Sequence, residues 1–269
     1  VVQSNVGTST ASPDAPSLEA AGPYEVGPSL GESELVVYSD DHFTTLGELP
    51  LARVRLLVDV WAQRYRELSA RDDVNYVFVF ENRAESLGGA LDHPHGRIYA
   101  YPEIPPLPAQ ELATASAYIA LHGTCVLCDV VAEERMQAAR VVNENEGFVA
   151  YVPFAARLPY EVTIAARRHA PSLLDLSDPE RDHLAALLLD LVQRYDALFG
   201  TPLLYVMAMH QTPTNDGQHL GISHLHIEFT PIDRLGDRLN YALGAELGAG
   251  SFVNDVLPEE AASALRAAR

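Results

Sequence analysis

Two landmarks recur at almost the same interval, and this constrains the fold more than any other feature of the chain. The tripeptide Gln-Arg-Tyr occurs at residues 63–65 and again at 193–195, 130 residues later. A His-x-His pair occurs at residues 93–95 and again at 224–226, 131 residues later. Two unrelated motifs repeated at nearly one spacing predict that the chain contains two copies of one structural unit.

Each copy shows the same order of local patterns. A strand-like run leads to His42 in the first copy and His169 in the second, and leucines follow each histidine at offsets of four and seven residues. Amphipathic helices are predicted next, over residues 52–68 and 180–198. A strand, a Gly-containing loop and the His-x-His strand complete the unit. This order predicts an α+β fold of two homologous halves, each an antiparallel sheet with packed helices.

The chain is expected to divide into four segments. Residues 1–33, rich in Ser, Pro and Gly, predict an N-terminal arm. The first half follows over 34–110, a connecting helix over 111–130, and the second half, with a C-terminal helix, over 131–269. The sequence begins at Val1 rather than Met, which leaves open whether the arm is complete.

Composition restricts the class of protein. Of 269 residues, 48% are hydrophobic and 20% charged, as expected for a soluble globular chain that needs no disulfides. A formal net charge of -19 opposes broad contact with polyanions, so neither a nucleic-acid nor a membrane partner is expected. The chain has no run of about 18 apolar residues and no signal-peptide pattern. The two cysteines, Cys125 and Cys128, fit a reducing cytoplasm.

The His-x-His strands are the candidate chemical sites. Alternate side chains on a strand share a face, so His93, His95 and Arg97 are expected to project together, as are those of the matching run 224–228. Paired imidazoles suit either metal ligation or a histidine nucleophile. A neutral imidazole is well suited to attack phosphorus, and an arginine or amide can then neutralise the phosphoryl oxygens.

Several motifs resemble one family. The run "FENRAESLGGALDHPHGRIYAYP" is similar to the active-site stretch of galactose-1-phosphate uridylyltransferases, members of the histidine-triad (HIT) superfamily. The resemblance continues through "VVYSDDHFTTLGEL", "VPFAARLPYEVTI", "MHQTP", "HLHIEFTP" and "FVNDVLPEEAASALR" in the same order. It implies two HIT-like halves and an enzyme of galactose metabolism.

The resemblance also implies a ping-pong reaction and its residues. His95 would be the nucleophile, taking UMP from UDP-glucose and passing it to galactose-1-phosphate. Arg97 stands beside it in the catalytic motif. Asn82, Glu246 and Asn5 would contact substrate. Family members are commonly homodimers, so a dimer is expected.

Metal sites are implied as well, for zinc, iron or both. One would use Glu111, His210, His224 and His226 to hold the two halves together; the alternative is that these side chains only bond locally. The other, for zinc, would use His42, His93 and a Cys-x-x-Cys pair expected upstream of Val1, unless this is a form without that site. The pair at 125 and 128 is interpreted as ordinary, partly buried cysteines.

The chain departs from the family pattern at Arg97, where glutamine is expected. A guanidinium is larger than an amide and permanently charged, so altered activity or a substrate with an additional negative charge is expected. Ala90, Asn240 and Ala245 also replace expected contacts. Two alternatives therefore stay open: a nucleotide-sugar or dinucleotide hydrolase or phosphorylase, and a non-catalytic paralogue that binds nucleotide or a partner chain.

Overall fold

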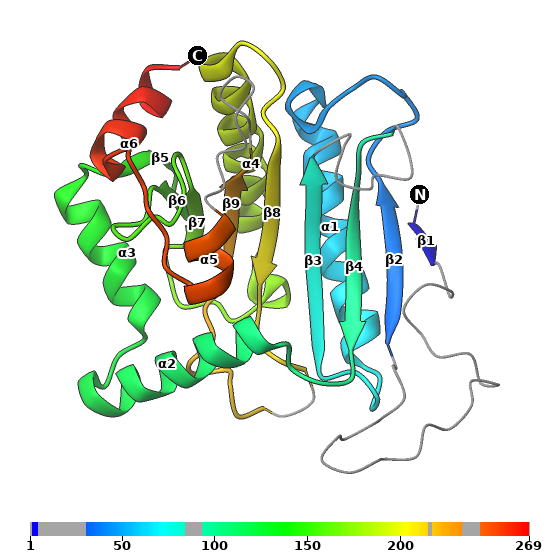
Figure 1. Cartoon of the computed structure of the whole chain (residues 1–269). Coiled ribbons are helices and arrows are strands. Elements are labelled where there is room, and N and C mark those ends of the chain that lie inside the picture. Colours follow the sequence, from blue (N-terminus) through cyan, green and yellow to red (C-terminus); the bar gives the residue numbers. More distant parts are fainter. Residues whose placement is uncertain (1, 5–30, 84–92, 215–216, 233–242, 269) are drawn as a thin grey trace.

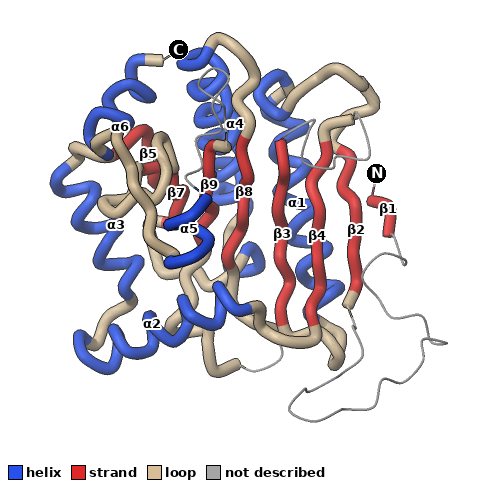
Figure 2. Tube along the Cα trace, viewed as in Figure 1, coloured by secondary structure: helices blue, strands red, loops and turns tan. Residues whose placement is uncertain are grey.

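A sheet of nine antiparallel strands forms the frame of the protein (Figures 1 and 2). The computed structural model describes residues 2–4, 31–83, 93–214, 217–232 and 243–268. Within them the strand order is β1-β2-β4-β3-β8-β9-β7-β6-β5. The strands are β1 (Val2–Ser4), β2 (Glu32–Val37), β3 (Tyr76–Arg83), β4 (His95–Tyr101), β5 (Val141–Glu144), β6 (Phe148–Tyr151), β7 (Val162–Ala166), β8 (Tyr205–His210) and β9 (His226–Pro231).

The two copies meet where β3 pairs with β8. Counted outward from this junction, the order is β3-β4-β2 on one side and β8-β9-β7 on the other. In the central pair Val79 lies opposite Met209, and Arg83 lies opposite Tyr205. The predicted α+β class with antiparallel pairing is confirmed. The expected two sheets form one continuous sheet, because the β3–β8 pairing satisfies backbone groups that two open edges would leave unpaired.

Helices α1 (Leu51–Ser69) and α4 (Asp178–Phe199) pack together on one face of the sheet (Figure 1). Their ranges lie close to those that the hydrophobic spacing predicts. Ser177 caps α4, since its backbone N–H donates to Glu180, and Gly200 ends the helix with a left-handed φ of 69°. The apolar stripes of both helices and one face of the sheet form the main hydrophobic core.

The histidines that open each copy are followed by matching 3-10 turns. Leu46–Glu48 forms the first turn and Leu173–Asp175 the second. Both leucine residues at the offset of four are buried in the main core. The repeated leucine spacing therefore marks a repeated local structure.

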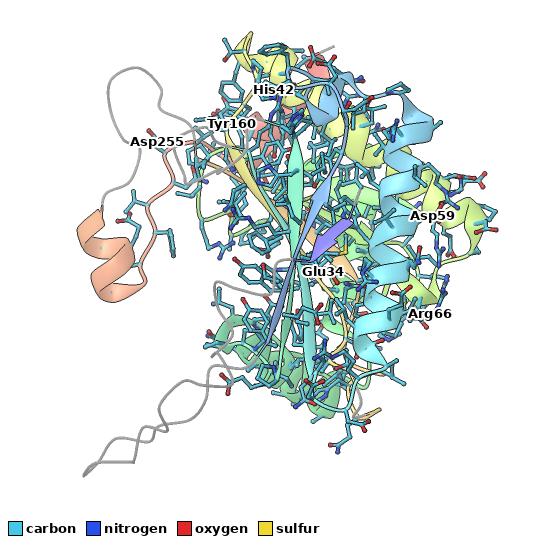
Figure 3. The ribbon with its side chains drawn as sticks, turned by 90° about the vertical axis from the view of Figure 1, so that its right-hand side faces the viewer. Glu34, His42, Asp59, Arg66, Tyr160 and Asp255 are labelled. Atoms are coloured by element: carbon cyan, nitrogen blue, oxygen red, sulfur yellow. The ribbon has the colours of Figure 1, made fainter. Side chains whose placement is uncertain are left out.

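Other helices cover the opposite face. α2 (Pro106–His122) and α3 (Val126–Gln137) are separated by Gly123, whose φ of 76° is left-handed. Val131 of α3 packs on Tyr151 and its neighbours in the sheet. α5 (Leu243–Ala249) also lies on this side, away from α1, as the nearly edge-on view of Figure 3 shows. α6 (Pro258–Ala267) instead joins the main core, where it packs against β5 and α4.

No individual helix among the described residues has the length and apolar character needed to cross a membrane. α2 and α3 meet the length and composition criteria only as a pair, which is bent by 78°.

Candidate functional site

His95 begins β4 and projects from the sheet face opposite α1 and α4. Its neighbours Ile98 and Ala100 point the other way into the main core, which fixes the direction of the alternate side chains. The Nδ1 atom of His95 lies 2.8 Å from the carbonyl oxygen of His93. A hydrogen bond to a carbonyl places the proton on Nδ1 and leaves the lone pair on Nε2. The local geometry thus prepares Nε2 as a nucleophile.

Arg97 shares this face and is half-buried. It lies opposite Leu35 on one side and Phe80 on the other, and Phe80 makes an edge contact with Tyr99 at 4.9 Å between ring centroids. The side chain of Arg97 has no ion pair or hydrogen bond within the described part of the chain. The aromatic rings of Phe80 and Tyr99 lie beside this guanidinium, and such a surface suits an anionic ligand. Asn82, also on this face, is exposed.

Gly96 lies between these two residues with its hydrogen toward the core. A Cβ atom here would overlap the hydroxyl oxygen of Tyr38 and would lie 3.2 Å from the carbonyl oxygen of Phe80. The glycine is therefore required by close packing beneath the strand rather than by a turn.

His42 and His93 form a pair at the same end of the sheet. Nδ1 of His42 lies 3.1 Å from Nε2 of His93. Nδ1 of His93 is buried and has no hydrogen-bond partner among the described residues. A buried imidazole nitrogen without a partner is costly, which fits a ligand atom whose other partners come from outside this pair.

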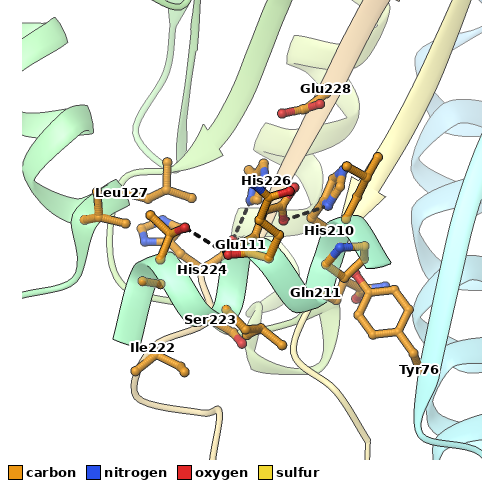
Figure 4. A pocket seen from close by; sticks show the side chains of 17 residues that line it. Tyr76, Glu111, Leu127, His210, Gln211, Ile222, Ser223, His224, His226 and Glu228 are labelled. Carbon is orange, nitrogen blue, oxygen red and sulfur yellow. Dashed lines mark hydrogen bonds and ion pairs between the residues drawn. The ribbon is translucent and has the colours of Figure 1, made fainter. Parts of the chain in front are cut away.

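A second-half cluster combines Glu111 of α2 with His210, His226 and Glu228 (Figure 4). The Glu111 carboxylate lies 3.0 Å from Nδ1 of His210, and the rings of His210 and His226 stack at 4.7 Å. Four candidate ligand atoms lie within 4.8 Å of one another. The cluster is therefore compact enough to hold a divalent cation.

Electrostatics in this cluster reflect burial and pairing. Burial acts to lower the pKa of His210, but the hydrogen bond and charge of Glu111 outweigh it and the pKa is raised. Burial likewise acts to raise the pKa of Glu111, and the pairing with His210 reverses this. Burial, with the charge of His210, lowers the pKa of His226. The pairing thus favours the charged forms of Glu111 and His210, and burial favours the neutral form of His226.

The structure places His224 in a different group from the other three predicted metal ligands. Its Nδ1 lies 3.5 Å from the sulfur of Cys128 and 3.7 Å from that of Cys125, while its Nε2 donates to the carbonyl of Ala166 at 2.8 Å. His169 completes the group, with Nδ1 3.7 Å from the Cys128 sulfur. The four residues Glu111, His210, His224 and His226 are predicted as one metal site. In the structure His224 lies in one group, and Glu111, His210 and His226 lie in another.

The group formed by Cys125, Cys128, His169 and His224 has the donors of a tetrahedral site. Its four ligand atoms lie within 4.8 Å of one another. Burial lowers the pKa of His224 to about 4, which keeps the ring neutral, and raises the pKa of the Cys128 thiol to about 12. A bound cation would offset the cost of buried thiolates.

The duplication itself carried the signal for this group. In the repeat, His169 corresponds to His42, and His224 corresponds to His93. The cysteines at the start of α3 therefore correspond to the Cys-x-x-Cys pair expected upstream of the first copy. Cys125 and Cys128, which the sequence alone suggests are ordinary cysteines, thus lie in a group that could hold a metal ion. For Glu228, strand alternation predicts only that it shares a face with His226.

A pocket of about 340 Å³ opens beside these groups, between α2, the start of α3 and the sheet. Its walls are mainly apolar, with Leu112 and Leu127 among the lining residues. Glu111, His210 and His226 form a polar patch in the same lining, as Figure 4 shows. The second-half cluster is therefore open to small molecules.

The remaining predicted contacts are more scattered. Glu246 lies in α5, half-buried, and its Oε2 has no hydrogen-bond partner among the described residues. Ala245 is exposed beside it. Asn5, Ala90 and Asn240 lie outside the described residues.

Comparisons with known proteins converge on one family. Residues 6–105 match the family model "Galactose-1-phosphate uridyl transferase, N-terminal domain", and residues 111–269 match the corresponding C-terminal domain. A galactose-1-phosphate uridylyltransferase of Thermotoga maritima is 40% identical over 245 residues, covering 91% of this chain and 76% of its own. One of Streptomyces lividans is 35% identical, covering 88% and 69%.

Comparison with solved structures supports the same family. A uridylyltransferase structure superposes with a TM-score of 0.89 at 32% identity, covering 99% of this chain and 84% of that one. An ADP-glucose phosphorylase of Arabidopsis thaliana shares the fold, with a TM-score of 0.79 at 24% identity over 90% and 74% of the two chains.

Proposed function

The chain belongs to the galactose-1-phosphate uridylyltransferase family, and from this premise we propose that it transfers UMP between UDP-glucose and galactose-1-phosphate through a covalent intermediate on His95. The observation that carries the covalent step is the 2.8 Å contact between Nδ1 of His95 and the carbonyl of His93. It fixes the tautomer in which Nε2 can attack, and the His95 side chain projects from the sheet face opposite α1 and α4.

The reaction proceeds in two displacements. Nε2 of His95 forms a bond to the α-phosphorus of UDP-glucose, and the bond to the β-phosphate oxygen breaks with release of glucose-1-phosphate. A phosphate oxygen of galactose-1-phosphate then forms the new P–O bond, and the P–N bond breaks. Arg97 lies two residues from the nucleophile on the same face, where it can neutralise the phosphoryl oxygens. Asn82, Glu246 and Asn5 are proposed substrate contacts.

The covalent intermediate can be tested directly. Incubation with UDP-glucose without acceptor should add the mass of a uridylyl group to the wild-type chain, in an acid-labile, base-stable form. His95→Asn is the control and should stay unmodified. If no nucleotide sugar labels the wild type above this variant, the proposal loses its basis.

Arg97 favours a second candidate, transfer to inorganic phosphate. The permanently charged guanidinium has no side-chain partner within the described residues, and it suits a small phosphate anion as acceptor. A product assay with galactose-1-phosphate, inorganic phosphate or water as acceptor separates transferase, phosphorylase and hydrolase.

We further propose that the metal groups are structural. Two thiolates and two imidazoles favour zinc, so Cys125, Cys128, His169 and His224 would hold that ion. Glu111, His210 and His226, with Glu228 nearby, suit zinc or iron and link α2 to both central strands of the second half. His42 and His93 provide two further ligands. These ions would fix side-chain positions and take no part in uridylyl transfer.

A cytoplasmic homodimer is proposed from the family alone. The proposed substrate contact of Glu246 has a separate test, because its Oε2 has no hydrogen-bond partner among the described residues. Glu246→Gln should raise the KM for the sugar phosphate while leaving the single-turnover uridylylation of His95 intact.

A further inference from the structure

Glu81 is a carboxylate buried directly behind the candidate active site. It lies on β3 next to Asn82, but its side chain points to the opposite face, and only 5% of its surface is exposed. The hydroxyl of Tyr38 donates to its Oε2 at 3.0 Å, and the hydroxyl of Tyr205 donates to its Oε1 at 3.1 Å. The two tyrosines come from opposite halves of the chain.

Tyr38 contacts the nucleophile strand at two points. Its backbone N–H donates to the carbonyl of Pro94 at 2.9 Å. Its hydroxyl oxygen fills the space that a Cβ atom on Gly96 would occupy. Tyr38 is 1% exposed and makes an edge contact with Trp61 of α1 at 6.3 Å, so it has no room to withdraw.

The carboxylate of Glu81 is stabilised mainly by these two hydroxyl groups, because the nearby cation has another partner. Arg83, two residues along β3, is the cation that acts on it, and Arg83 is already paired with Asp196 of α4 at 2.8 Å. Tyr38, which directly follows β2, and Tyr205, on the adjacent strand β8, are the tyrosines that face it. Burial raises the pKa of Glu81 to about 7, although both tyrosines act against this.

We propose that Glu81 is a positioning residue for His95, which acts by holding Tyr38 beneath Gly96 and by tying that support to the second half through Tyr205. This rests on the proposed role of His95 as nucleophile. The backbone of residues 93–97 sets the direction of the attacking imidazole, and displacement of a reacting group by about 1 Å costs on the order of 100-fold in rate. A carboxylate with two oxygens can accept from both tyrosines at once.

The first test separates positioning from stability. Glu81→Gln keeps the shape but offers one acceptor oxygen, and Tyr38→Phe removes one donor. Each should slow single-turnover uridylylation of His95 at least tenfold, while the affinity for UDP-glucose, measured in the His95→Asn background, changes less than twofold. Tyr195→Phe is the matched control, because it also removes the hydroxyl of a fully buried tyrosine, one that donates to Tyr160 at 2.7 Å.

The second test addresses the contact itself. Gly96→Ala should lower the melting temperature and the rate because its Cβ meets the Tyr38 hydroxyl. Adding Tyr38→Phe should restore part of the loss in melting temperature, although the ring carbon Cζ remains 3.1 Å away. A double variant that melts no higher than Gly96→Ala would overturn the inference, whether or not the chain has activity.

The third readout is the pH dependence of the single-turnover rate. Ionisation of Glu81 creates the second acceptor, so the wild-type rate should gain a rising component near pH 7 that Glu81→Gln lacks. If both variants lose stability as Tyr195→Phe does but keep the wild-type rate and pH profile, Glu81 is only structural. Failure of the wild type to be uridylylated would instead remove the proposed function.

Discussion

His95 and His226 hold the same orientation in the two copies of the unit. In each, Nδ1 lies 2.8 Å from the carbonyl oxygen of the histidine two residues earlier. Their surroundings differ: His226 stacks on His210 and lies near the Glu111 carboxylate, whereas His95 lies near Arg97. Carboxylates favour a cation and repel phosphate, so the same prepared imidazole suits a metal in one half and a phosphoryl group in the other.

Replacing Arg97 by glutamine should accelerate turnover with UDP-glucose. The fixed charge stabilises the uridylylated intermediate, and its removal should speed the second displacement about tenfold, equal to about 1.4 kcal/mol of barrier. Rapid-quench kinetics of each half-reaction measure this. Arg97→Lys, which keeps the charge, is the control and should remain slow. No change or a loss would mean that another acceptor is the native one.

Replacing Cys128 by serine should remove one zinc equivalent per chain. The group formed by Cys125, Cys128, His169 and His224 would lose a thiolate ligand. The melting temperature should fall by several degrees because metal binding stabilises the folded state. Elemental mass spectrometry and thermal unfolding measure both. Glu111→Gln is the matched control, since it alters the neighbouring cluster and should leave this zinc in place. Equal zinc content in wild type and Cys128→Ser would contradict the assignment.

Unfolding stability should depend on pH through Glu81. Burial raises its pKa from 4.5 to about 7, so the folded state holds the proton more tightly than the unfolded state. The stabilisation is complete below pH 4.5 and is lost as the pH rises through 7, a change of roughly 3 kcal/mol at most. Urea unfolding of wild type and Glu81→Gln from pH 5 to 8 should show the steeper decline in the wild type. Parallel curves would refute this.

Replacing Asp196 by alanine should be strongly destabilising. The side chain of Arg83 is 10% exposed and would keep an unpaired charge, and the N–H of Leu203 would lose its acceptor. We expect a loss of about 3 kcal/mol in urea unfolding. Glu144→Ala is the comparison, because its pair with Arg135 is 41% and 33% exposed and should contribute less than about 1 kcal/mol.

The order of elements could be predicted because it depends on local patterns. Hydrophobic spacing defined α1 and α4, and the His-x-His landmarks located β4 and β9. The pairing of β3 with β8 could not be predicted. Both strands have buried side chains on one face, and neither sequence indicates which other strand it pairs with.

The candidate site could be predicted only in part. His95, Arg97 and Asn82 share a strand pair, so their common face follows from alternation. The division between His224 and His226 depends on how α2 and α3 approach the sheet, because Glu111 and Cys125 arrive on different helices. The role of Glu81 depends on two tyrosines 43 and 124 residues away in sequence.

The central pairing of β3 with β8 makes the two copies inseparable. Either copy on its own would end in a bare, mostly buried strand edge, a template for a second copy of itself. The fused chain meets that demand internally, and its two halves are therefore expected to melt in one transition. The functional residues of one copy can then change without loss of the fold, because pairing with the other copy maintains the shared sheet.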